Sequence, residues 1–146
     1  MANFNPPDDD YEARVRDSFV QQGMMKHIGA VLTKVAPGEV EIQLPFSLDL
    51  TQQNGFLHAA AVTAIVDSAC GYAAYTLTEK GDNVLTIEFK VNFLAPAKGQ
   101  LMIARGRVLR SGRSVTVCAG DVFARSDGEE KLIATMLTTI KVLQAE

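Results

Sequence analysis

The chain has 146 residues, with 14 Lys and Arg against 17 Asp and Glu, so its formal net charge is −3. This length fits one domain, taken as residues 1–146, and the slightly acidic balance argues against a protein that neutralises nucleic-acid phosphates. Neither a signal peptide nor an apolar run of membrane-spanning length is present, so we expect a cytoplasmic protein with no membrane or nucleic-acid partner.

The start of the chain predicts a short helix after a polar segment. Residues 1–10 are polar and contain prolines, so we expect them to be flexible. Pro7 followed by three aspartates is typical of a helix start. Val15 and Phe19 then give an apolar stripe, and the helix should end before Gly23.

The next segment has the features of a β-hairpin. Residues 24–35 mix β-branched and polar side chains, and Ala-Pro-Gly-Glu at 36–39 predicts a turn. Apolar and polar residues alternate over 39–44, which is typical of a half-buried strand. His27 is therefore expected to be an exposed strand residue outside any site. Residues 45–55 should form an irregular connection.

A helix from His58 to about Leu77 should form the centre of the molecule, because nearly every residue in this run is apolar or small. The larger apolar side chains recur at spacings of three and four and predict a core side: Val62, Ile65, Val66, Ala69, Tyr72 and Ala73. The opposite side is a stripe of small residues: Ala60, Thr63, Asp67, Cys70, Gly71 and Ala74. A lone carboxylate on such a stripe needs a partner or a function, so Asp67 is a candidate site residue.

Four β-rich runs follow, at 84–94, 100–110, 114–125 and 131–143, and the short breaks between them indicate antiparallel neighbours. This order of elements predicts an α+β fold, with a curled antiparallel sheet wrapped around one long central helix and a short N-terminal helix. The two cysteines, Cys70 and Cys118, should be small core residues without a disulfide. Scattered histidines and unpaired carboxylates predict no metal site.

Several candidate residues lie at the ends of these elements. His58 can cap free amides at the helix start, which would be a structural role. The amides of Ala59 and Ala60 are suited to polarising a carbonyl oxygen, although every helix start has such amides. Arg110 and Arg113 flank a hairpin where they can bind phosphates, but charges at a strand end are also typical of a solvated face.

The run Gln52-x-x-Gly55-x-x-His58-Ala59-Ala60, with a helical Asp67 nine residues after the histidine, carries a family resemblance. It resembles the signature of hotdog-fold acyl-CoA thioesterases of the phenylacetate-degradation type, Asn-x-x-Gly-x-x-His-Gly-Gly followed by a helical Asp. The strand at 86–97, with its Pro-Ala end, is similar too. The resemblance covers residues 35–142, roughly.

This resemblance implies a hotdog fold and hydrolysis of an acyl-CoA to a free acid and CoA, with no cofactor because coenzyme A is part of the substrate. It implies that Asp67 activates water or attacks, and that Ala59 supplies the oxyanion-hole amide. Gln52 would assist at the carbonyl, with the Thr86 hydroxyl near the acid. Substrate contacts are implied for His58, Ala60, Asn54 and Gly55, and for Arg110, Ser111, Gly112 and Arg113 where the family meets the CoA nucleotide.

Two departures from the family pattern keep alternatives open. Ala59-Ala60 replaces the paired glycines, and Gln52 replaces the Asn. An added methyl group can crowd the thioester, which favours a non-catalytic acyl-CoA-binding protein as one alternative. A hotdog hydratase or dehydratase is another, but it needs a His beside the acid, and His58 is about half a turn away from the face of Asp67.

The spacing of the two main candidates predicts a shared site. Ala59 and Asp67 are eight residues apart on one helix, which is ~12 Å along its axis. The acid and the oxyanion donor must act on the same carbonyl group, so one helix cannot supply both. Two antiparallel copies can, which predicts a homodimer with two shared sites. The family resemblance implies, as the larger assembly, a tetramer built as a dimer of dimers.

Overall fold

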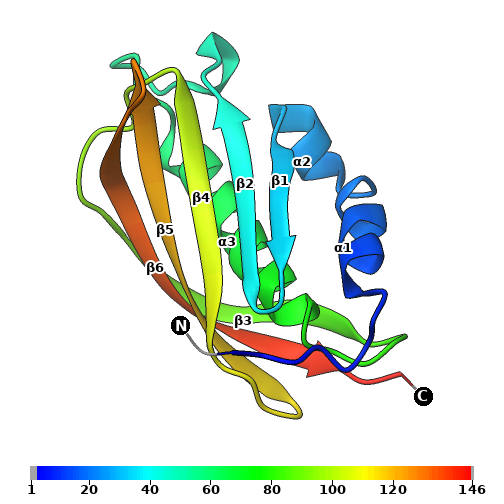
Figure 1. Cartoon of the computed structure of the whole chain (residues 1–146). Helices are drawn as coiled ribbons and strands as arrows, with labels where there is room; N and C mark the ends of the chain where they lie inside the picture. The colour runs from blue at the N-terminus through cyan, green and yellow to red at the C-terminus, as the bar shows by residue number, and fades with distance from the viewer. Residues whose placement is uncertain (1–2, 146) are drawn as a thin grey trace.

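The structure is a computed structural model that describes residues 3–145. Figure 1 shows its sheet curled around the long helix α3. The elements are α1 (Tyr11–Phe19), α2 (Gly23–Ile28), β1 (Val31–Ala36), β2 (Glu39–Pro45), the 3₁₀ turn η1 (Leu48–Leu50), α3 (Ala59–Tyr75), β3 (Asn83–Phe93), β4 (Leu101–Arg110), β5 (Val115–Ser126) and β6 (Glu129–Leu143). The predicted α+β hotdog architecture is confirmed.

The six strands form one antiparallel sheet in the order β1-β2-β4-β5-β6-β3. The connections from β4 to β6 are hairpins, whereas β3 lies at the far edge and pairs with β6. Every strand predicted after the helix is present, with ends within two residues of the predicted ones. No helix within residues 3–145 has the length and apolar character needed to cross a membrane.

A pair of glycines lets α3 lie directly on the sheet. Gly106 of β4 and Gly120 of β5 are register partners. A Cβ at position 106 would come within 2.4 Å of the Ala69 backbone, and one at position 120 within 2.5 Å of Val66 Cγ2. Ile65, Val66 and Ala69 are fully buried, so the predicted core side of the helix is confirmed.

The open face of α3 is narrower than predicted. The expectation that Cys70 and Ala74 belong to the small-residue stripe is wrong, because both are buried. Cys70 faces β5, where its Sγ would lie 2.7 Å from a Cβ at Gly120, since the curled sheet covers more of the helix than one flat side. Burial raises the pKa of Cys118 to about 12, and both cysteines are free core thiols as predicted. The accessible stripe contains Ala60, Thr63, Asp67 and Gly71.

Residues 23–28 correct the prediction that the first strand begins at Met24. They form the short helix α2, in which Met25 and Ile28 are buried at helical spacing. Gly29, with φ of +79°, ends this helix, and β1 begins only at Val31. His27 is exposed as expected, but on a helix.

Arg14 fixes α1 against the C-terminal end of α3. Its Nη2 donates to the Thr78 carbonyl at 2.9 Å, and its guanidinium lies 4.4 Å from the centre of the Tyr75 ring. Asp8 pairs with Arg14 Nε at 2.8 Å. Unpaired carbonyl groups at the C-terminal end of a helix favour a cation, so Arg14 holds α1 against the end of α3. Figure 1 shows α1 beside β1.

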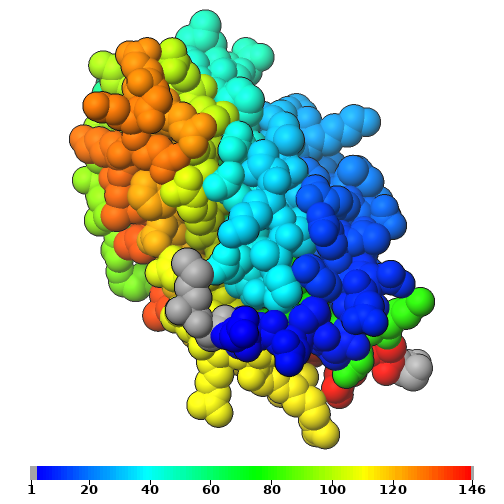
Figure 2. Space-filling model, in the orientation of Figure 1, coloured from blue at the N-terminus to red at the C-terminus, as the bar shows by residue number. Residues whose placement is uncertain are grey.

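The N-terminal segment contacts the rest of the fold. Residues 1–10 were expected to be flexible, and residues 1–2 of this segment lie outside the described residues. Phe4 packs against the core and lies over Gly38 at the β1–β2 turn. Figure 2 shows this segment and α1, in blue, against the cyan hairpin of β1 and β2.

Candidate functional site

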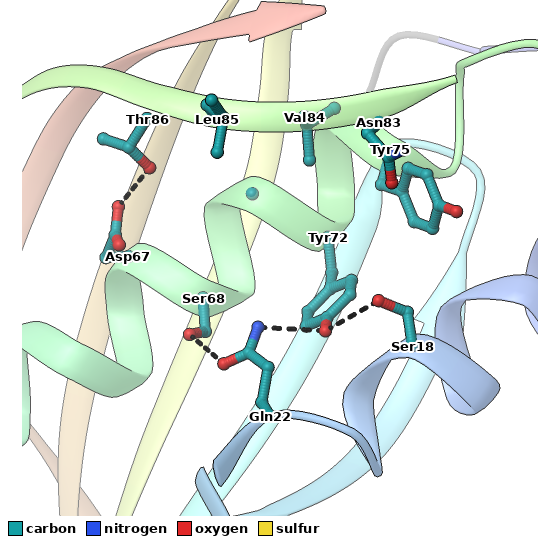
Figure 3. Close-up of a pocket in the computed structure, with 11 residues that line it drawn as sticks. Ser18, Gln22, Asp67, Ser68, Tyr72, Tyr75, Asn83, Val84, Leu85 and Thr86 are labelled. Atoms are coloured by element: carbon teal, nitrogen blue, oxygen red, sulfur yellow. Dashed lines mark hydrogen bonds between the residues drawn. The ribbon is translucent and has the colours of Figure 1, made fainter. Parts of the chain in front are cut away.

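Asp67 and Thr86 meet between α3 and β3. Thr86 Oγ1 donates a hydrogen bond to Asp67 Oδ1 at 2.8 Å, drawn in Figure 3. Asp67 is half-buried, and burial raises the pKa of its carboxyl group, while the bond from Thr86 acts in the opposite direction with a smaller effect. The structure therefore brings the expected acid and the expected neighbouring hydroxyl together.

A β-bulge directly follows Thr86, whose side chain points to the same face as that of Val84, two residues earlier. The pairing of β3 with β6 shifts register between Thr86 and Glu88, which leaves Ile87 as the extra residue. Val84 and Val91 are seven positions apart, so in a regular strand they would point to opposite faces of the sheet. Both nevertheless pack against the core. The bulge makes up this difference, and Thr86 is the last inward residue before it.

The N-terminal end of α3 presents one free amide. His58 is the N-cap, and its Nδ1 accepts a hydrogen bond from the Ala60 amide at 2.9 Å. The Ala61 amide donates to the His58 carbonyl at 3.0 Å. The capping role predicted for His58 is confirmed, and it occupies the amide of Ala60. Within residues 3–145 the Ala59 N–H has no partner, so Ala59 alone is positioned to polarise a carbonyl oxygen.

The loop before α3 is held by its own hydrogen bonds. The Gln52 amide donates to the Phe56 carbonyl at 2.8 Å, and the Gln52 side chain accepts from the Asn54 amide. Gly55, with φ of +82°, allows the turn between them. Gln52, His58 and Ala59 line a cavity of about 630 Å³, whereas Asn54 and Gly55 do not.

The acid and the free amide line different cavities. Asp67 and Thr86 line one of about 370 Å³ between α3 and β3. Ala59 and Gln52 line the cavity of about 630 Å³ at the helix start, together with Phe93 and neighbouring apolar residues. A single chain therefore keeps the two halves of the expected chemistry apart.

The β4–β5 turn lies outside both cavities. Arg110, Ser111, Gly112 and Arg113 are exposed and line neither of them. Nearby arginines are already paired: Arg105 Nε lies 2.9 Å from Glu41, and Arg107 Nη1 lies 2.8 Å from Asp121. In the described chain Arg110 and Arg113 make no such ion pair, so their role at a CoA nucleotide stays a prediction.

Sequence reasoning missed several residues of the Asp67 cavity, and three of them form a connected polar group. Ser18 of α1, Gln22 between α1 and α2, and Tyr72 of α3 all line it (Figure 3). Tyr72 was expected only in the core, and no local motif marks Ser18 or Gln22. The only available signal was the apolar stripe of α1, which predicts packing without naming the surface that it covers.

Comparison with known proteins gives consistent matches. The family model described as Thioesterase superfamily matches residues 54–131, which contain Ala59, Asp67 and Thr86. A thioesterase family protein from Silicibacter pomeroyi, of known crystal structure, is 49% identical with a TM-score of 0.90, covering 91% of this chain and 98% of that chain.

Two further proteins extend this comparison. The 1,4-dihydroxy-2-naphthoyl-CoA hydrolase of Listeria monocytogenes is 26% identical over 120 residues, covering 82% of this chain and 95% of that protein. The PaaI protein from the phenylacetic acid degradation operon of E. coli has a TM-score of 0.84 at 13% identity, covering 93% of this chain and 95% of that chain. At 13% identity, the similarity to the PaaI protein shows a shared fold alone.

Proposed function

The chain belongs to the thioesterase superfamily, and from this membership we propose that it hydrolyses an acyl-CoA thioester to the free acid and CoA. Membership of this family supports hydrolysis of thioesters in general. The proposal adds that the thioester is an acyl-CoA. The observation that carries the proposal is the Asp67–Thr86 pair, which lines a cavity. Asp67 lies on α3, the same helix whose first residue has a free amide.

The proposed reaction needs only groups of this chain and water. The Asp67 carboxylate either removes a proton from water as it attacks the carbonyl carbon or attacks that carbon itself. The carbonyl oxygen gains negative charge, which the Ala59 N–H stabilises with help from the Gln52 side chain. Collapse of the intermediate breaks the carbon–sulfur bond, and the CoA thiolate leaves and takes up a proton. With water as the nucleophile this gives the free acid directly; with Asp67 as the nucleophile it leaves an acyl anhydride on Asp67, which a water molecule then hydrolyses to the free acid and the carboxylate. Thr86 holds one carboxylate oxygen in place.

A second copy of the chain would complete this site. The sheet has two edge strands, β1 and β3, and β3 is the one that contacts Asp67. On β3, Leu85 is 60% exposed and Ile87 is 56% exposed. A long apolar edge strand is normally paired or covered. Edge-to-edge pairing of two β3 strands about a two-fold axis sets the two α3 helices antiparallel. Ala59 of one copy then lies toward Asp67 of the other.

The two alternatives make different demands on the same residues. A hydratase needs a histidine beside the acid. In a shared site His58 of one copy would approach Asp67 of the other, but its Nδ1 already accepts a hydrogen bond from the Ala60 amide. A non-catalytic acyl-CoA binder requires that the Ala59 methyl group keeps the carbonyl away from the amide. Measuring whether bound acyl-CoA is hydrolysed distinguishes this binding protein from a thioesterase.

A panel of acyl-CoA thioesters, with release of the free CoA thiol as the readout, tests the proposal. Thiol release that depends on the purified protein and follows enzyme concentration is the expected result. Saturable binding of the thioesters without thiol release would identify a binding protein. Hydration of an unsaturated acyl-CoA without thiol release would identify a hydratase.

A further inference from the structure

The edge strand β3 carries two charged side chains, Glu88 and Lys90, on either side of Phe89. Val91 packs against the core, so the alternation of a strand places Phe89 on the inner face of the sheet. The same alternation places both charges on the outer face, where their side chains are exposed. The free side of this strand therefore presents an acidic, an aromatic and a basic residue in succession.

The contacts of these two charges inside the chain are with uncharged groups. Glu88 accepts a hydrogen bond from the Thr139 hydroxyl, and Lys90 Nζ donates to Asn92 Oδ1 at 2.7 Å. Each contact leaves the side chain exposed at the edge of the sheet. Both charges are therefore available to a second strand that pairs with β3.

The shared site fixes where a two-fold axis would cross β3. Thr86 is level with the acid, because its hydroxyl bonds to Asp67. Phe93 is level with the free amide, because it lines the same cavity as Ala59. When the amide of one copy faces the acid of the other, the axis lies midway between these two levels. On β3 the midpoint falls at positions 89–90.

Face and charge then select one register near that midpoint. Residues opposite each other in an antiparallel pair point to the same face, so one residue must lie opposite its own copy on the axis. With Glu88 or Lys90 on the axis, two like charges would meet, which is destabilising. With Phe89 on the axis, Glu88 of each copy lies opposite Lys90 of the other. This register alone pairs opposite charges, and it does so twice.

We propose that two copies pair their β3 edges with Phe89 opposite Phe89, and that two reciprocal Glu88–Lys90 ion pairs fix this register. The inference rests on the shared site of the proposed function and names residues that align it. Moving the axis by one residue would slide the copies by two residues, ~7 Å, and carry the amide away from the acid. Glu88 and Lys90 line neither cavity, so they are positioning residues.

Two charge reversals, Glu88→Lys and Lys90→Glu, test the ion pairs. In a homodimer of either variant like charges lie opposite each other, whereas in a mixed dimer every charge meets the opposite sign. Equal amounts of the two variants, with different affinity tags, are exchanged at low salt. Mixed dimers should reach about nine tenths of the total instead of the chance value of about one half, which corresponds to a roughly tenfold preference. High salt should lower the fraction toward chance.

A matched control is available on the neighbouring strand. Glu129 and Lys131 of β6 have the same residue types at the same spacing, and they pair with β5 at the end away from β3. A mixture of Glu129→Lys and Lys131→Glu proteins should give the chance fraction of mixed dimers.

Single cysteines test the register itself. Opposed residues of an antiparallel pair have Cα atoms about 4.5–5.5 Å apart, a distance that a disulfide spans. Mild oxidation should therefore cross-link the Phe89→Cys dimer, but not the Glu88→Cys or Lys90→Cys dimer. The native Cys70 and Cys118 are buried, and burial raises the pKa of both thiols, so they should not react.

The outcomes separate this inference from the function on which it rests. A chance fraction of mixed dimers from the β3 reversals overturns the ion pairs. Cross-linking at Glu88→Cys or Lys90→Cys, or at none of the three positions, overturns the register. All of these readouts measure assembly. If the original protein hydrolyses no thioester, the proposed function fails, while the exchange and cross-linking results still decide the register.

Discussion

The two ends of the accessible side of α3 are built in different ways. At the N-terminal end, the cap, the free amide and Gln52 all come from residues 52–60, and backbone hydrogen bonds hold them. Around Asp67, the neighbours come from β3, α1 and the α1–α2 connection. The amide end depends on local chain geometry, and the acid end depends on packing between distant segments. Variants at each end should therefore fail in different ways.

Removing only the free amide should give the largest loss of activity. In the Ala59→Pro protein we expect kcat to fall by ~100- to 1000-fold, the range for loss of one oxyanion donor. Proline is well tolerated at the first helical position. His58, with φ of −61° and ψ of 140°, already has the backbone that a residue before proline adopts. Hydrolysis of the best CoA thioester measures the loss, and circular dichroism checks the fold.

The matched control is Ala59→Gly, which keeps the amide and removes the methyl group. It should retain activity, or gain some if the methyl group crowds the thioester. Full activity in a folded Ala59→Pro protein would remove the Ala59 amide from the mechanism.

Neutralising the acid should give the next largest loss. Asp67→Asn keeps an oxygen that can accept from Thr86 but cannot act as base or nucleophile. We expect kcat to fall by at least ~100-fold, the scale for a positioned acid or base. Near-normal turnover in a folded Asp67→Asn protein would contradict the assignment.

Thermal melting supplies the control for this variant. Because burial raises the pKa of Asp67 above its unfolded value, ionisation of this carboxyl costs the folded state stability as pH rises through that pKa. The Asn variant should therefore melt no lower than the original protein at neutral pH. Any advantage should disappear in acid, below the unfolded pKa, where both side chains are neutral. If activity is lost and the melting temperature does not fall, Asp67 acts in the reaction rather than in folding.

The exposed turn should give a smaller effect, confined to binding. If Arg110 and Arg113 contact CoA phosphates, replacing both with Ala should raise KM for acyl-CoA by about fivefold, since exposed charge pairs contribute little. The kcat value should not change, and short thioesters without the nucleotide should be unaffected. Equal effects on both kinds of substrate would assign these arginines to a solvated face.

The smallest effect at neutral pH is expected from Thr86→Val. The Thr86 bond lowers the pKa of Asp67, so its loss should raise that pKa. Activity requires the carboxylate, and the acid limb of the pH–rate profile should therefore move to higher pH. Thr86→Ser keeps the hydroxyl and should leave the limb in place. A Val variant with an unshifted limb would show that this bond does not tune the acid.

Sequence patterns predicted the features that depend on short-range chemistry. The apolar run predicted α3, the position of His58 predicted the helix cap, and alternating apolar and polar residues predicted strands. The helix α2 was missed because six residues with two buried positions are too short for a clear period. The bulge beside Thr86 and the contact of Gly106 with Ala69 depend on partners far along the chain, which no local pattern specifies.

The central claim is that each site takes its amide from one chain and its acid from another, and subunit mixing tests it most directly. Asp67→Asn and Ala59→Pro proteins, each inactive alone, are mixed under conditions in which subunit exchange is shown with two different affinity tags. A heterodimer then has one site with both Ala59 and Asp67 intact and one site with neither. The account predicts that purified heterodimers recover about half of the activity of the original dimer. Heterodimers that stay inactive after proven exchange would contradict the shared site.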